Sequence, residues 1–320
     1  MDLSLFYFAD DSTRQAARRY DLLLHGARFA DTHGFAAVWT PERHFHRFGG
    51  NYPNPAVTGA AVAAVTERVA VRAGSVVAPL HDPEQIVRDW RLINTSSNGR
   101  AGVSLASGWN RGDFVLNSTG FEDRVRLTTE AVHALRGTGI PLWLTSGGSP
   151  ETFVAAGRLG VGVLTHLASQ TPAVLAQRIQ EYRAAFRDGG HPGSGHVALM
   201  LHAYVGQTER EVEQEVRGPL EDYLMSAMNL MRPGDDSRSD AQSRLRLARL
   251  AVQPAYEKYM HGGSLIGTVD QALPVAEEFG RMGVDEIACL VDFGLPTEVV
   301  LGGLENLDTL LQTIRGRALS

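Results

Sequence analysis

Short apolar runs alternate with longer amphipathic stretches along the whole chain. The runs are rich in residues that favour β-structure, and each is followed by a segment of helical length. Such alternation is typical of units made of one strand and one helix. The pattern predicts eight strands, at Leu3–Phe8, Ala36–Trp39, Val69–Val77, Gly102–Ala106, Leu142–Thr145, Gly162–Leu167, Val197–Val205 and Glu286–Val291.

The stretches between the strands have the spacing of amphipathic helices. In the first of them apolar residues recur at intervals of three and four, as at Tyr20, Leu24 and Ala27. Pro83 and Pro172 fit the first turn of a helix, where the missing N–H leaves no hydrogen bond unmade. The predicted helices are Arg14–Thr32, Pro83–Asn94, Arg124–Leu135, Pro150–Leu159, Pro172–Arg187 and Thr297–Thr313.

Eight strand–helix units in series fit either an eight-stranded barrel or a doubly wound sheet. Polar, glycine-rich segments follow the strands, and the active sites of barrels are built from the loops in these positions. A dinucleotide-binding doubly wound sheet would carry G-x-G-x-x-G after its first strand, where this chain reads FADDSTR. We therefore expect an α/β fold, a (β/α)8 TIM barrel.

One segment interrupts the regular spacing. About eighty residues separate the seventh predicted strand from the last one, far more than a single crossover helix requires. The segment contains two amphipathic helices, Glu209–Leu230 and Ala241–Met260, followed by a short helix. We expect residues 1–320 to form a single domain, with residues 206–265 as an insertion before the last strand that covers the barrel mouth as a lid.

Composition and charge narrow the possible functions. The 320 residues are 43% hydrophobic and 21% charged, as in globular domains, and the net charge of -6 disfavours a nucleic-acid surface. No apolar stretch approaches the roughly 20 residues that span a bilayer, and the first residues lack the basic segment of a signal peptide. The single cysteine, Cys289, excludes an internal disulfide and a thiolate metal cluster. We expect a cytoplasmic protein with no nucleic-acid or membrane partner.

The segment Thr145–Thr152, TSGGSPET, leads from a predicted strand into a helix. It contains a glycine pair, Gly147 and Gly148. Free backbone N–H groups at the helix start, beside the hydroxyls of Ser149 and Thr152, form a cradle suited to phosphate. In the alternative interpretation Ser149 only caps the helix. The segment alone does not distinguish the two.

Two further stretches are candidates for a ligand site. In Ser104–Phe114 small residues precede Trp109, whose indole is suited to the wall of a cofactor site. A tryptophan in a loop also packs on its own core, which is the alternative here. In the third strand, Gly74 and Ser75 mark either a bulge or a place where a ligand approaches the backbone.

The segment after the second strand, WTPERHFHRFGG, combines charged, histidine and aromatic residues. His44 and His46 have the H-x-H spacing that lets two imidazoles on one strand face reach one ion. A metal site requires more ligands, and only His166 and His202 are available at other strand ends. We therefore predict no metal.

The structural alternative for this segment needs no ligand at all. Glu42, Arg43 and Arg47 would form ion pairs over the barrel, and His44 would be buried and hydrogen-bonded. The residue types fit such a cluster as well as they fit a binding site.

Several stretches together resemble the bacterial luciferase-like flavin-dependent monooxygenases, and among them the branch encoded in natural-product biosynthesis. The similarity runs in order from Leu3 to Leu311, and HGFAAVWTPERHF and ASGW are its most specific parts. It implies a barrel that binds reduced FMN at its mouth. The stretches are WTPERHFHRFGGNYPNPAV, RAGSVVAPLHDP, NGRAGVSLASGWNRGDF, SPETFVAAGRLGVGVLTHL and DEIACLVDFG.

The resemblance assigns flavin-binding roles to individual residues. Gly74 and Ser75 match a dipeptide, often joined by a non-proline cis bond, that underlies the flavin ring. Trp109 matches a residue beside the ring. Ser149 and Thr152 match positions that contact the phosphate, so the cradle interpretation is preferred over the simple cap.

The phosphate site also shows departures from the family pattern. Arg124 matches an arginine that reaches the phosphate, but Ser107 stands where luciferase has a phosphate-binding arginine. Only RGTGIP joins the fourth helix to the fifth strand, where relatives carry about twenty to thirty residues more. We expect the short connection to open the edge of the pocket or to weaken flavin binding.

Catalytic roles follow from the same resemblance. Luciferases carry a histidine pair before the phenylalanine of this loop, and its first member acts in catalysis; here that position is Arg43, and only His44 remains. Histidine changes charge near neutral pH, so His44 would control the oxidant formed from reduced flavin and dioxygen. Glu42 and Arg43 would set its tautomer or position the substrate, and Phe45 and Phe48 would supply apolar walls.

The expected reaction is the oxygenation of a natural-product intermediate, free or tethered to a carrier protein, with reduced FMN as co-substrate. No nicotinamide motif is evident, so a separate flavin reductase would supply the reduced FMN. Helices near Pro55–Thr66 and Pro83–Asn94 would form a homodimer. Three alternatives stay open: a deazaflavin-dependent oxidoreductase, a non-catalytic flavin-binding subunit of a luciferase-like complex, and a metal-dependent hydrolase.

Overall fold

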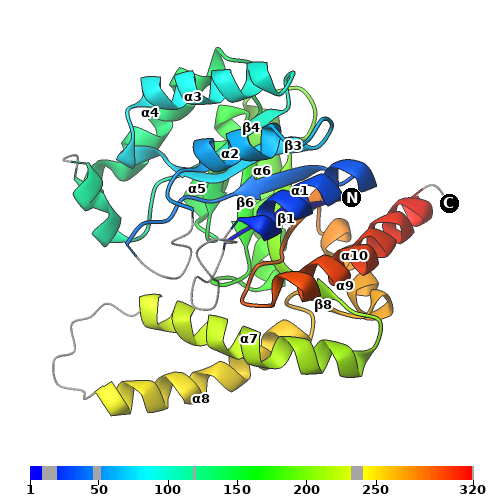
Figure 1. Cartoon of the computed structure of the whole chain (residues 1–320). Coiled ribbons are helices and arrows are strands. Elements are labelled where there is room, and N and C mark those ends of the chain that lie inside the picture. The colour runs from blue at the N-terminus through cyan, green and yellow to red at the C-terminus, as the bar shows by residue number, and fades with distance from the viewer. Residues whose placement is uncertain (9–19, 46–51, 118–119, 232–240, 319–320) are drawn as a thin grey trace.

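Parallel strands close into a barrel in this computed structural model, which describes residues 1–8, 20–45, 52–117, 120–231 and 241–318 (Figure 1). The barrel strands are β1 (Asp2–Phe6), β2 (Ala37–Thr40), β3 (Ala70–Val77), β4 (Ala101–Ala106), β5 (Leu142–Ser146), β6 (Gly162–His166), β7 (Val197–Val205) and β9 (Glu286–Leu290). Strand β1 pairs with β2 on one side and with β9 on the other, and the pairing of β6 with β7 closes the ring. The prediction of a (β/α)8 TIM barrel is confirmed.

Helices cover the outside of the barrel and lead each strand to the next (Figure 1). They are α1 (Asp21–His33), α2 (Pro55–Ala63), α3 (Pro83–Ser96), α4 (Arg124–Arg136), α5 (Pro150–Leu159), α6 (Pro172–Asp188) and α10 (Thr297–Ala318), with short 3-10 turns η2 (Ala78–Leu80), η3 (Arg111–Leu116) and η4 (Phe121–Asp123). In α3 the buried residues Ile86, Trp90 and Ile93 recur at helical spacing, and Asp82 caps the first turn. The part of the first predicted helix before residue 20 lies outside the described residues.

Residues 206–265 form an insertion between the last two strands of the barrel, β7 and β9. They form α7 (Glu209–Met231) and α8 (Ala241–Met260), which lie side by side below the barrel in Figure 1, and the strand β8 (Leu265–Gly267). Strand β8 pairs with the end of β7, and α9 (Val269–Arg281) then leads to β9. The sequence pattern predicted the two long helices but missed β8, because three residues are too few to show a period. It also predicted a short helix where α9 has 13 residues, since Pro274 interrupts the pattern.

A buried ionic cluster fills the end of the barrel at which the strands begin. Glu286 accepts hydrogen bonds from Ser4 Oγ at 2.5 Å and Trp39 Nε1 at 2.8 Å, and it pairs with Arg72 at 2.7 Å. The Arg72 guanidinium lies between the rings of Trp39 and Trp143, 4.9 and 4.7 Å from their centroids. Burial alone would raise the pKa of Glu286, but Arg72 and the other partners lower it, so the carboxylate stays charged. These contacts pack side chains from β1, β2, β3, β5 and β9 against one another inside the barrel.

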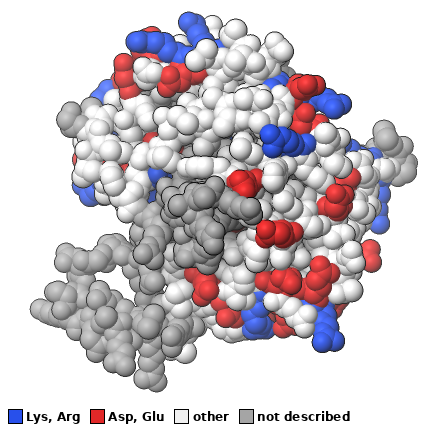
Figure 2. Space-filling view, viewed as in Figure 1, with Lys and Arg blue, Asp and Glu red and all other residues white. Residues whose placement is uncertain are grey.

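Charged side chains of both signs lie on the outer surface. Acidic and basic side chains are interspersed on the face that Figure 2 shows. Within the described residues, every helix is too short or too polar to cross a membrane. The helices therefore bury one face against the barrel and turn charged side chains outward, as α3 does with Arg91.

Candidate active site

A cavity of about 370 Å³ opens at the end of the barrel where the strands finish. The strand ends contribute Ser75, Thr145 and His202 to its wall. The insertion contributes Tyr223, Met228 and Tyr259 from α7 and α8. The insertion thus forms part of the cavity wall, and the cavity is in the position that active sites occupy in such barrels. A role of the insertion as a lid stays a prediction.

The peptide bond between Gly74 and Ser75 is cis, as the family resemblance implied, and both residues line the cavity. A side chain at Gly74 would place its Cβ 2.6 Å from Phe6 Cε2 and 3.1 Å from Trp39 Cε3, so only glycine fits. The hydroxyl of Ser75 is hydrogen-bonded to the hydroxyl of Thr145 on β5. The register with β4 shifts at this point, so the stretch is a bulge, and the approach of a ligand to its backbone stays a prediction.

Glu42, which follows β2 closely, holds two imidazoles on one oxygen. Its Oε1 lies 2.7 Å from Nε2 of His44 and 2.7 Å from Nε2 of His81, while its Oε2 accepts the N–H of Val77 at 2.8 Å. Burial alone would raise the pKa of Glu42, but these hydrogen bonds lower it below its ordinary value. Burial alone would lower the pKa of His81, but the hydrogen bond and the charge of Glu42 raise it. The cluster therefore favours an ionised Glu42 beside a protonated His81.

The position of His44 differs from the simplest expectation for a catalytic group. Glu42 lines the cavity, whereas His44 is not among the residues that do, and its imidazole is bonded to Glu42 next to the cavity. The catalytic role of His44 stays a prediction. Phe45 was predicted to form an apolar wall; this is wrong, because its side chain is 69% exposed and lies outside the cavity lining. Residues 46–50 of this segment, which include His46, Arg47 and Phe48, lie outside the described residues.

The guanidinium of Arg43 lies in the cavity wall beside two aromatic rings. It is 5.0 Å from the centroid of Trp109 and 6.0 Å from that of Phe8. Its Nη1 is 3.7 Å from Oδ2 of Asp113, an ion pair too long for a hydrogen bond. Burial lowers the pKa of Arg43 and raises that of Asp113, and their attraction opposes both shifts. The predicted ion pairing of Arg43 is thus present, but with Asp113 and not with Glu42.

The start of α5 has the geometry of a capped helix. Ser149 Oγ accepts the N–H of Thr152 at 3.3 Å and donates to Oε2 of Glu151 at 2.7 Å. Gly148 has a φ of 117°, which favours glycine, and it precedes the cap. The capping role of Ser149 is therefore present, and the phosphate role of these residues stays a prediction.

The other residues assigned to the phosphate differ in their surroundings. Gly147 lies beside His166, which lines the cavity, so the loop before α5 reaches the cavity edge. Ser107 is half-buried after β4 and is not in the cavity wall. Arg124 donates to the carbonyl of Phe121 at 3.0 Å, and its guanidinium lies 4.0 Å from the centroid of that ring. Contact of Ser107 and Arg124 with a phosphate stays a prediction.

Two histidines line the cavity, the half-buried His166 and the buried His202. Burial lowers the pKa of both, that of His202 to about 3, so both imidazoles are neutral at neutral pH. The ring of His202 packs against Tyr223 and Tyr259, with centroid distances of 4.8 and 4.7 Å. Across the ranges that the structure describes, no three His, Cys, Asp or Glu side chains are grouped to hold a metal ion.

Sequence reasoning missed several residues of the cavity wall and its surroundings. His81 had a signal, because it stands in the polar segment that follows the third strand. Asp113 had the same signal, in the polar segment that follows the fourth strand, whereas Tyr223, Lys258 and Tyr259 had none. These three belong to the insertion helices, where the sequence shows which face is apolar but not which residues that face meets.

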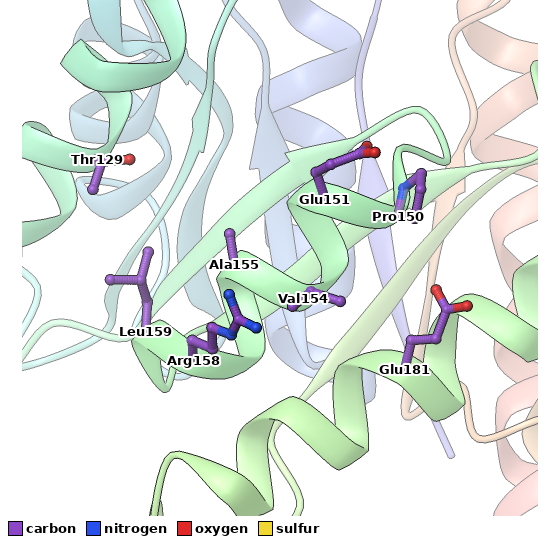
Figure 3. Close-up of a pocket in the computed structure, with 8 residues that line it drawn as sticks. All are labelled: Thr129, Pro150, Glu151, Val154, Ala155, Arg158, Leu159 and Glu181. Atoms are coloured by element: carbon purple, nitrogen blue, oxygen red, sulfur yellow. The ribbon is translucent and has the colours of Figure 1, made fainter.

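A second hollow of about 580 Å³ lies on the outer surface, between α4, α5 and α6 (Figure 3). Val154, Ala155 and Leu159 of α5 line it, with Thr129 of α4 and Glu181 of α6 on opposite sides. Its charged residues are exposed or half-buried, in contrast to the buried ionisable groups at the barrel mouth. Buried groups with shifted pKa values mark functional sites, so the barrel mouth is the candidate active site.

Solved structures share the fold over nearly their whole length. Monooxygenase RslO1 from Streptomyces bottropensis has a TM-score of 0.80 at 18% identity, covering 98% of this chain and 100% of that one. The oxygenating constituent of 3,6-diketocamphane monooxygenase from Pseudomonas putida, in complex with FMN, has a TM-score of 0.75 at 16% identity, covering 97% and 98%. An F420-dependent secondary alcohol dehydrogenase has a TM-score of 0.73 at 17% identity, covering 97% and 99%.

The sequence itself matches known proteins along most of its length. The oxygenase component of a flavin-dependent trigonelline monooxygenase from Acinetobacter baylyi is 22% identical over 344 residues, covering 96% of this chain and 93% of that protein. The sequence also matches the Luciferase-like monooxygenase family over residues 1–139 and 137–286. Because this match spans the barrel from β1 into β9, the chain belongs to the luciferase-like monooxygenase family.

Proposed function

We propose that this protein is a monooxygenase that uses reduced FMN and dioxygen to oxygenate an organic substrate at the barrel mouth. The observation that carries the proposal is the cavity at the strand ends, with the peptide of Gly74 and Ser75 in its wall. A flat ring can lie close to a wall that is made of backbone and has no side chain in the way. Gly74 provides such a wall, since a Cβ at this position would collide with Phe6. Relatives described as flavin-dependent monooxygenases support the same reaction class.

The residues present fit FMN. Val77 and Trp109 supply apolar and aromatic surface for a ring, and at Gly108 a Cβ would lie 2.9 Å from Val77, so backbone again forms part of the wall. The start of α5 supplies backbone N–H groups for a phosphate. The hydroxyl of Ser149 would donate to the phosphate in place of its hydrogen bond to Glu151. Reduced FMN, when bound, supplies the electrons that activate dioxygen.

The residues of the chain would exclude water and control protons. Tyr223 and Tyr259 of the insertion help to enclose the cavity, and enclosure keeps water from diverting a reactive oxidant. Glu42 lines the cavity, and its Oε1 can exchange a proton with His44 or His81, since both imidazoles are 2.7 Å away. The His81 side chain is 27% exposed, so this route connects the cavity with solvent.

We infer a natural-product intermediate as the substrate, free or tethered to a carrier protein, from the resemblance of the sequence to that branch of the family. A separate reductase would supply the reduced FMN, because the sequence carries no nicotinamide-binding motif. The isolated protein should accordingly bind reduced FMN but should not reduce FMN with NADH or NADPH.

Labelled dioxygen tests the proposal. Deletion of the gene identifies the substrate as the compound that accumulates, and this compound is then offered to the protein with chemically reduced FMN and ¹⁸O-labelled dioxygen. One labelled oxygen atom should appear in the product. A protein that does not bind reduced FMN, or a product without label, contradicts the proposal.

A deazaflavin-dependent oxidoreductase is the second candidate, because an F420-dependent alcohol dehydrogenase has the same fold. Such an enzyme transfers hydride and consumes no dioxygen. Tighter binding of reduced F420 than of reduced FMN, without dioxygen uptake, would select it. A non-catalytic flavin-binding subunit is favoured by Ser107 and by the short connection from α4 to β5, and it would bind FMN without turnover.

A further inference from the structure

A buried cation in the cavity wall has one edge without hydrogen-bond partners. Arg43 is 4% exposed, and neither Nε nor Nη2 has a partner among the described residues. These two atoms form one edge of the guanidinium, which a carboxylate can bridge with two parallel hydrogen bonds. Because a buried charged donor without a partner costs free energy, an anion bound at this edge would stabilise the site.

The neighbours of Arg43 position its guanidinium without using this edge. The guanidinium lies over the rings of Trp109 and Phe8, and Asp113 approaches only Nη1, at 3.7 Å. Asp113 has a closer partner of its own, Asn110 Nδ2, at 2.7 Å. Arg43, Trp109, Phe8 and Asp113 all line the cavity, so a ligand held there lies next to this cluster.

The other charged groups of the cavity leave the charge of Arg43 available. Glu42 is already hydrogen-bonded to His44 and His81, and the raised pKa of His81 favours the protonated form that balances its charge. Burial raises the pKa of Asp113, so this carboxyl loses its negative charge more easily than an exposed one. Lys258 adds a second cation to the lining, with its Nζ donating to a backbone carbonyl at 3.0 Å. The cavity is therefore better suited to an anion than to a neutral ligand.

We propose that Arg43 binds a carboxylate of the substrate through Nε and Nη2, so that the enzyme selects substrates that carry a carboxylate near the reacting group. The identification of this ligand as the substrate rests on the proposed function, whereas carboxylate binding itself requires no flavin. A carboxamide of the same shape offers one acceptor oxygen and no charge, so it should bind less tightly.

Pairs of carboxylates and carboxamides test the proposal by calorimetric titration. The probes are benzoate with benzamide, phenylacetate with phenylacetamide, and octanoate with octanamide, each with and without FMN. The wild-type protein should bind at least one carboxylate about tenfold or more tightly than its carboxamide, because charge-assisted hydrogen bonds exceed neutral ones by this order. If no pair shows the preference, the proposal is overturned.

Substitutions assign the preference to one side chain. Arg43→Met should abolish it, and Arg43→Lys, which keeps the charge but loses the two-donor edge, should retain only part of it. A matched control should leave it unchanged: Arg111→Met, which removes a cation whose side chain is 71% exposed. A preference that survives Arg43→Met, or that is lost in Arg111→Met, overturns the proposal.

Two further measurements separate this proposal from the proposed function and from a purely structural role. A protein that prefers carboxylates but does not bind reduced FMN supports the Arg43 site and contradicts the monooxygenase. The double variant Arg43→Met, Asp113→Asn should melt no lower than the wild type, because a buried ion pair of this geometry adds little stability. A fall of more than about 5 °C would assign Arg43 to the fold and overturn the proposal.

Discussion

Replacing Glu42 by glutamine removes the charge that holds two histidines at the edge of the cavity. The wild-type side chain is fully buried and accepts hydrogen bonds of 2.7 Å from His44 and His81 and of 2.8 Å from Val77. Glutamine has one acceptor oxygen and one NH2 group. With the oxygen on the N–H of Val77, the NH2 group can donate to the imidazoles only if both are neutral and accept at Nε2.

The effect of this substitution depends on pH. Since Glu42 raises the pKa of His81 above 6.5, the stability from protonated His81 is fully present below pH 6.5 and is lost as the pH rises through the folded pKa. Since the pKa of Glu42 is lowered below 4.5, its contribution is present above pH 4.5 and is lost as the pH falls through the folded pKa. The pair stabilises the fold most between pH 4.5 and 6.5.

Urea unfolding at two pH values measures this difference. Near pH 5.5, Glu42→Gln should lower the free energy of unfolding by about 2–3 kcal/mol, the scale of a buried hydrogen bond between charged groups. At a second, higher pH above the folded pKa of His81, the loss should fall to about 1 kcal/mol, the scale of a neutral hydrogen bond. The control is Glu130→Gln, which removes an exposed ion pair with Arg126 and should change stability little at either pH. An equal loss at both pH values, or a larger one at the higher pH, would refute the reasoning.

Three further predictions concern the flavin, the oxidant and the assembly. Arg124→Ala should weaken FMN binding by about 1–3 kcal/mol, and riboflavin, which lacks the phosphate, should bind much more weakly than FMN; equal affinities of FMN and riboflavin in a titration would contradict the phosphate assignment. His44→Ala should leave FMN binding intact but release more hydrogen peroxide and form less product per dioxygen consumed. The loss of product formation should be about 10²–10⁴-fold, the scale of general acid–base catalysis. An unchanged ratio of product to dioxygen in a stably folded variant would remove His44 from the mechanism. The protein should form a homodimer through α2 and α3, where the apolar side chains of Val57 and Leu92 are 67% and 70% exposed. Light scattering should show a dimer for the wild type and a monomer for the double variant Val57→Asp, Leu92→Asp. A wild-type monomer at micromolar concentration would count against this.

The sequence predicted which segments build the barrel because burial acts on whole segments. The strands are apolar runs and the helices have apolar stripes, so their bounds follow from local patterns; α5 and α8 begin and end where the pattern placed them. Topology then gathers the segments after the strands at one end of the barrel. For this reason Glu42, Gly74 and Trp109, which lie far apart along the chain, could be assigned to one cavity before its geometry was known.

The direction of individual side chains was decided by tertiary structure. In the loop after β2 the sequence favoured His44 as the group that faces the reaction, whereas Glu42 and Arg43 line the cavity and His44 lies beside them. A loop has no periodic pattern, so the face that each residue turns to the cavity depends on its backbone and neighbours. The family resemblance located the loop but could not orient its side chains.

The partners of the buried charges were also decided by tertiary structure alone. Hydrophobic burial is a property of each segment and leaves a period in its sequence, which is why the sequence by itself determined the barrel and the end of it that carries the site. An ion pair or a shared hydrogen bond joins segments and leaves no such pattern. Glu42 meets His81, and Arg43 meets Asp113, only because β2, β3 and β4 lie side by side in the sheet, which brings their ends together.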